Sequence, residues 1–105
     1  MNNYIKELEQ AQKARERGNE GQARVCARRA TGIAIKDYLT RKGIQPPSVS
    51  AYDLLNYMKE EPLLPPDLKL VAEHLTVRVT EEFKLPIDAD LIAESRQLCE
   101  WLIKN

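Results

Sequence analysis

Three arginines stand in a stretch that is otherwise rich in small apolar residues, ARVCARRATGIAIKDYL. Arg24 and Arg28 are one helical turn apart, and Arg29 is next to them. A guanidinium group presents a planar fork that suits phosphate, so these side chains could line a phosphate-binding groove. They could equally form a solvated helix face, because Glu20 precedes Arg24 by four residues, a favourable helical pairing. The chain has no glycine-rich loop nearby, and this favours the solvated face.

Net charge limits the classes of partner. Sixteen basic residues balance sixteen acidic ones. This argues against a dominant, sequence-independent attraction to nucleic acid or to anionic lipid, which usually needs a basic excess. A local basic patch is still compatible with the balance.

His74 is the only histidine of the chain. A histidine can act as a general base, but it then needs a nucleophile or an acid within reach, and no such motif surrounds it. We therefore expect a partly exposed side chain at the edge of the fold.

Metal and cofactor motifs are not found either. Four carboxylates lie close together in the sequence: Glu81, Glu82, Asp88 and Asp90. Metal sites in helix bundles use a Glu-x-x-His motif, whereas Glu73 adjoins His74 directly. The two aspartates are explained by helix capping and by the helix dipole. GxGxxG, GxxxxGK and CxxC are absent, so we expect no metal and no cofactor.

The two cysteines, Cys26 and Cys99, each lie in an apolar helical stripe. The N-terminal MNNYIKELEQ has no apolar core and no small-residue cleavage site, so we expect no signal peptide. The apolar runs are also far shorter than a membrane span of about 20 residues. Together these features predict two reduced, buried thiols in a cytoplasmic protein, with a disulfide less favoured.

Periodicity and capping residues predict five helices, at residues 3–17, 20–42, 51–60, 66–83 and 89–104. Asn19, Ser50 and Asp88 are predicted N-caps, Gly18 ends the first helix, and Pro66 opens the fourth. LTVRVT alternates like a strand, but Leu68, Val71, Ala72, Leu75 and Val79 fall on one helical stripe, which favours helix to about Phe83. The predicted fold is a single all-α helical bundle over residues 1–105.

The order of these helices resembles the HEPN family (higher eukaryotes and prokaryotes nucleotide-binding domains). The resemblance rests on three stretches: ARVCARRATGIAIKDYLTRKG, SAYDLLNYM and AEHLTVRVTEEFKLPIDADLIAESRQLCEWL. The first is an alanine-rich central helix that ends in lysine-glycine, and the second is a short helix with a leucine pair. In the third, an aromatic-basic-x-proline turn precedes a last helix that ends near a tryptophan.

The resemblance implies an antiparallel bundle that dimerises. Many members are ribonuclease toxins, and others are partner subunits of small nucleotidyltransferases. The ribonucleases carry an arginine and a histidine four to six residues apart near the turn before the last helix. Here the matching basic position is Lys84, and neither Lys84 nor Arg78 upstream is followed by a histidine. The nuclease activity therefore does not carry over.

Three hypotheses remain. The first is a non-catalytic HEPN-like interaction module, a homodimer that binds another protein such as a nucleotidyltransferase. The second is an RNA-processing enzyme, and the third a nucleotide-binding bundle that uses a basic face. The candidate contact residues for a ligand or nucleic acid are Arg24, Arg28, Arg29, Arg78 and Lys84. We rank the interaction module first, because it needs no chemistry that the sequence does not show.

Overall fold

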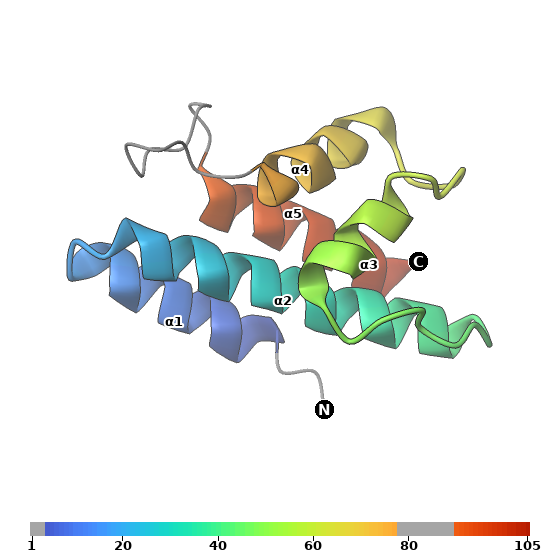
Figure 1. Cartoon of the computed structure of the whole chain (residues 1–105), viewed down its shortest axis with the longest axis horizontal. Coiled ribbons are helices and arrows are strands. Elements are labelled where there is room, and N and C mark those ends of the chain that lie inside the picture. Colours follow the sequence, from blue (N-terminus) through green and yellow to red (C-terminus); the bar gives the residue numbers. More distant parts are fainter. Residues whose placement is uncertain (1–3, 78–89) are drawn as a thin grey trace.

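The computed structural model describes residues 4–77 and 90–105, and this part of the chain folds into five helices (Figure 1). They are α1 (Tyr4–Glu16), α2 (Glu20–Arg41), α3 (Ala51–Met58), α4 (Pro66–Thr76) and α5 (Leu91–Lys104). Helix α2 packs against α1, α3 and α5, and α4 packs against α3 and α5. The predicted all-α class is confirmed, and α2 occupies the centre of the bundle.

The helix starts follow the capping residues. Asn19 Oδ1 accepts a hydrogen bond from the Gln22 backbone N–H at 3.1 Å, and Ser50 Oγ accepts one from the Asp53 N–H at 3.4 Å. Pro66 occupies the first turn of α4. The side-chain amide of Gln22 lies 3.5 Å from Cys26 Sγ, and the Asn19 backbone N–H donates to the Ala14 carbonyl at 2.8 Å.

The start of α5 corrects one prediction. Its N-cap is Asp90, whose Oδ1 accepts a hydrogen bond from the Ala93 N–H at 3.2 Å. The helix thus begins at Leu91 and not at residue 89. Asp88, the predicted cap, lies outside the described residues. Two aspartates two residues apart are both competent caps, so local sequence alone does not choose between them.

Helix α4 ends earlier than predicted. Its last residue is Thr76, and Val77 already has extended backbone at φ −67° and ψ 133°. Thr76 Oγ1 donates to the carbonyls of Ala72 and Glu73, both at 3.0 Å, which competes with the regular helical pattern. The prediction of helix is therefore confirmed through Thr76 and wrong at Val77, and the remainder up to Phe83 lies outside the described residues.

The face of α2 that carries most of its small residues is buried. Its most buried members are at most 3% exposed: Ala23, Cys26, Ala27, Ala30, Ala34 and Tyr38. Ile35 and Leu39, beside that face, are fully buried, whereas Val25 stays 40% exposed. Helix α2 is thus covered on more than one side, and it leaves one strip open near Val25.

Two arginines of α2 donate hydrogen bonds to the C-terminal ends of other helices. Arg28 Nε donates to the carbonyl of Leu75 at 2.8 Å, and an Arg41 terminal nitrogen donates to the carbonyl of Leu102 at 2.6 Å. Both carbonyls lie in a last helical turn, where the backbone has no helical partner for them. Helix α2 therefore caps both α4 and α5.

The cysteines behave as predicted: Cys26 and Cys99 are buried and form no disulfide. Burial raises the pKa of the Cys99 thiol to about 12, because the thiolate would lose its hydration. Cys99 is therefore an unreactive core residue.

Among the helices described, none combines the length and apolar character that crossing a membrane demands.

Candidate basic groove along helix α2

A groove runs along the open strip of α2. One part, of about 370 Å³, lies against the segment that starts α3, and a second part, of about 630 Å³, lies against the last residues of α4. The two parts share Val25, Arg28 and Tyr52, so they form one continuous surface, which we call the basic groove. Its remaining lining residues are Gly21, Arg24, Arg29, Gly32, Ile33, Lys36, Val49, Ser50, Ala51, Thr76 and Val77.

All charged residues described in the lining of this groove are basic. Arg24, Arg28, Arg29 and Lys36 line it, and no described lining residue is acidic. The whole chain has a formal net charge of zero. The groove is therefore a local basic patch on a protein without net charge, which the sequence analysis had left open.

Arg28 is the most constrained of the four cations. Its Nε is committed to the Leu75 carbonyl, which leaves the terminal nitrogens for other contacts. Burial lowers the pKa of Arg28, and the neighbouring Arg24 lowers it further. Within residues 4–77 and 90–105, no carboxylate forms an ion pair with Arg24 or Arg28. An anion in the groove would thus relieve a partly desolvated cation.

Arg29 is already paired. One of its terminal nitrogens lies 3.3 Å from Glu7 Oε1 on α1, and its side chain is 56% exposed. This residue ties α1 to α2 at the rim, so it contributes less free charge to the groove than Arg24.

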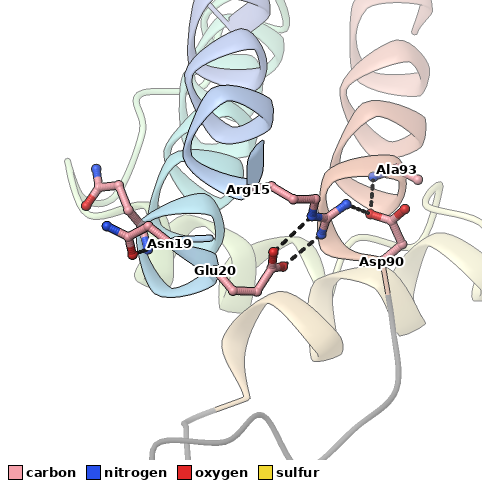
Figure 2. Close-up of polar contacts among 6 residues, drawn as sticks. Arg15, Asn19, Glu20, Asp90 and Ala93 are labelled. Carbon is pink, nitrogen blue, oxygen red and sulfur yellow. Dashed lines mark hydrogen bonds and ion pairs between the residues drawn. The ribbon is translucent and has the colours of Figure 1, made fainter. Parts of the chain in front are cut away.

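Glu20 and Arg24 form no direct ion pair, although the charge of Arg24 contributes to lowering the pKa of Glu20. Glu20 instead receives two hydrogen bonds from Arg15, at 3.0 Å and 2.8 Å, and Arg15 also donates to Asp90 Oδ1 at 2.9 Å (Figure 2). These bonds lower the pKa values of Glu20 and Asp90. Arg15 thus forms an ion pair with Glu20 that connects α1 to α2, and Arg24 lines the groove.

The groove also has an apolar component. Val49 is 86% exposed and Val25 is 40% exposed, while Tyr52 and Ile33 are half-buried. Exposed valines beside cations are suited to a partner that is both acidic and partly apolar. The sequence did not single out Val49, because it lies in the linker before α3.

Arg78 and Lys84 lie outside the described residues, so their predicted contact role stays a prediction. Thr76 and Val77, the last described residues before them in the sequence, line the groove. Arg24, Arg28 and Arg29 are brought to the same groove, together with Lys36.

A second polar contact lies away from the groove. His74 Nδ1 is 2.6 Å from Glu94 Oε1, and the two side chains are 23% and 21% exposed. His74 is partly exposed as predicted, but its partner was missed because 20 residues separate the two in the sequence. Among the residues described, no cluster of three or more side chains could hold a metal ion.

No family model, no curated protein and no solved structure matches the chain.

Proposed function

We propose that this protein is a non-catalytic, HEPN-like interaction module of the cytoplasm that binds a partner protein through the basic groove. The observation that carries the proposal is the groove itself. It combines four cations with exposed valines, and no described lining residue is acidic. Binding needs only such a complementary surface, whereas catalysis would need a positioned acid, base or nucleophile.

The resemblance to HEPN proteins supplies the expected assembly. On that basis we infer a homodimer and a nucleotidyltransferase-type protein as partner. Sedimentation of the purified chain tests the dimer, because a monomer at all concentrations would contradict it.

The binding partner is tested by mild purification of the tagged protein from its native cell. We expect a stoichiometric protein to accompany the wild-type chain and to be lost from a Val25→Asp/Val49→Asp variant. Ile5→Asp is the matched control, because Ile5 is 50% exposed on α1 and does not line the groove.

Two results would contradict the proposal. One is a wild-type chain that purifies alone. The other is a partner that both variants retain, which would place the interface elsewhere on the surface.

A second candidate function is binding of a nucleotide or of RNA. It is favoured by Arg28, a partly desolvated cation whose terminal nitrogens have no described carboxylate. A ligand at 100 times its Kd stabilises the fold by about 2.7 kcal/mol, so melting temperatures across a nucleotide and RNA panel test this candidate. An unchanged melting temperature would eliminate it, and incubation with cellular RNA would show whether any cleavage occurs.

A further inference from the structure

We infer that the basic groove receives an acidic amphipathic helix of the partner protein, whose carboxylates face Arg24, Arg28 and Lys36 and whose apolar side chains cover Val25 and Val49. This inference rests on the proposed function and specifies the chemistry of the partner.

Charge complementarity gives the first argument. Neither Arg24 nor Arg28 has an ion pair with a carboxylate of the described residues. Glu20, the acidic residue best placed in sequence to neutralise Arg24, is bound by Arg15. The groove thus keeps its positive charge available, and a partner with carboxylates supplies the missing counter-charge.

Spacing gives the second argument. Arg24 and Arg28 are one turn apart on α2, and Lys36 lies twelve residues beyond Arg24, about 18 Å along the helix and about 120° around it. A helix that crosses α2 obliquely follows this winding row, and its carboxylates have the same rise when they are separated by four residues. About three turns of such a helix span the row of cations.

The apolar surface gives the third argument, and it distinguishes protein from nucleic acid. Val25 lies between the two arginines in sequence, and Val49 projects 86% exposed from the other wall. An amphipathic helix covers such residues with its apolar face. A single strand of nucleic acid would need an aromatic stacking platform, and Tyr52 is the only aromatic residue among the described lining residues.

The test is a selection from a displayed library of random 16-residue peptides on the purified full chain. We expect the enriched peptides to carry Asp or Glu at positions i and i+4, with apolar residues at helical spacing between them. The best peptide is then synthesised and its affinity measured at low and high salt, where added salt should weaken the binding.

The variant for this test is Arg24→Glu/Lys36→Glu, which we expect to bind the peptide at least about tenfold more weakly. Arg28 is left unchanged because it caps α4 through Leu75. Lys6→Glu/Lys13→Glu is the control: it makes the same change of charge at two exposed positions on α1 that do not line the groove. Circular dichroism and melting establish that each variant folds.

The inference would be overturned if the selection enriched no peptide, or if the enriched peptides lacked acidic residues or carried them at alternating rather than helical positions. It would also be overturned if a 20-nucleotide oligouridylate bound more tightly than the best peptide. Because the native purification is independent, the two proposals can fail separately. A partner that the valine variant loses, together with peptides lacking acidic residues, would leave the proposed function standing and remove this inference alone.

Discussion

At the scale of single residues, Gly32 fixes how closely α3 approaches α2. A Cβ atom added at Gly32 would lie 2.8 Å from Ala51 Cβ and 3.1 Å from Ala51 Cα. The start of α3 forms one wall of the groove, so this contact sets the width of the groove at that end.

Replacing Gly32→Ala is expected to lower the free energy of unfolding by about 1 kcal/mol, because the overpacking outweighs the gain in helix propensity. Gly21→Ala is the control on the same helix: its Cβ would have no neighbour closer than 3.8 Å. Urea unfolding of both variants measures the difference. Equal stability of the two variants would show that α3 shifts without cost.

The residue pairs show what sequence can and cannot predict at this scale. The caps Asn19 and Ser50 were predictable, because capping is decided within four residues. The pairing of Glu20 was not, because Arg15 and Arg24 are both near it in sequence and only the path of the α1–α2 turn selects Arg15.

At the scale of elements, Arg15, in the last turn of α1, joins the start of α2 to the start of α5 (Figure 2). Its partners Glu20 and Asp90 have pKa values below their ordinary ones. A carboxyl with a lowered folded-state pKa contributes stability above its unfolded pKa and loses that contribution as the pH falls.

Arg15→Gln is therefore expected to lower the free energy of unfolding by about 1 kcal/mol at pH 7, a value reduced to allow for the solvent exposure of these side chains. The difference in free energy of unfolding between the variant and the wild type should shrink as the pH falls from about 5 towards 3. Arg17→Gln is the control, since Arg17 lies two residues further along, just after the end of α1, and has no ion pair with any described residue. Urea unfolding at both ends of this pH range provides the measurement, and a gap independent of pH would contradict the expectation.

The contact of His74 with Glu94 joins the last turns of α4 to the first turn of α5. A double-mutant cycle with His74→Gln and Glu94→Gln should give a coupling energy of about 1 kcal/mol, because both side chains are mostly shielded from water. The more exposed pair of Arg29 and Glu7 should give a smaller coupling, about 0.3 kcal/mol. Couplings of equal size in the two cycles would show that burial contributes nothing here.

At the scale of the whole molecule, the buried apolar residues of all five helices form one cluster. Trp101, partly buried, packs against Tyr38 of α2 with the ring centroids 5.7 Å apart. The fluorescence of Trp101 therefore reports on the contact between α2 and α5.

We expect unfolding to be a single transition, because every helix shares this core. The midpoints in urea from Trp101 fluorescence and from helical circular dichroism should coincide. A fluorescence transition that clearly precedes the loss of helix would mean that α5 separates from α2 before the rest of the bundle unfolds.

The fold class and the positions of the five helices could be predicted from the sequence, since periodicity, caps and prolines are local signals. The end of α4 could not be predicted, because it depends on which carbonyls near that end accept hydrogen bonds from Thr76 and Arg28. The groove was only partly predictable. Arg24, Arg28 and Arg29 stood out, whereas Val49 and Thr76 come from other elements and reach the groove only through packing.

The two arginines of α2 that bond to Leu75 and Leu102 have a consequence for biosynthesis. The ribosome makes α1 and α2 before α4 and α5, so the donors that complete the later helices exist before those helices are made. Because all five helices share one core, we expect these bonds to form only after α4 and α5 have left the ribosome and packed against α2. Completion of the two helix ends is thereby tied to the end of translation.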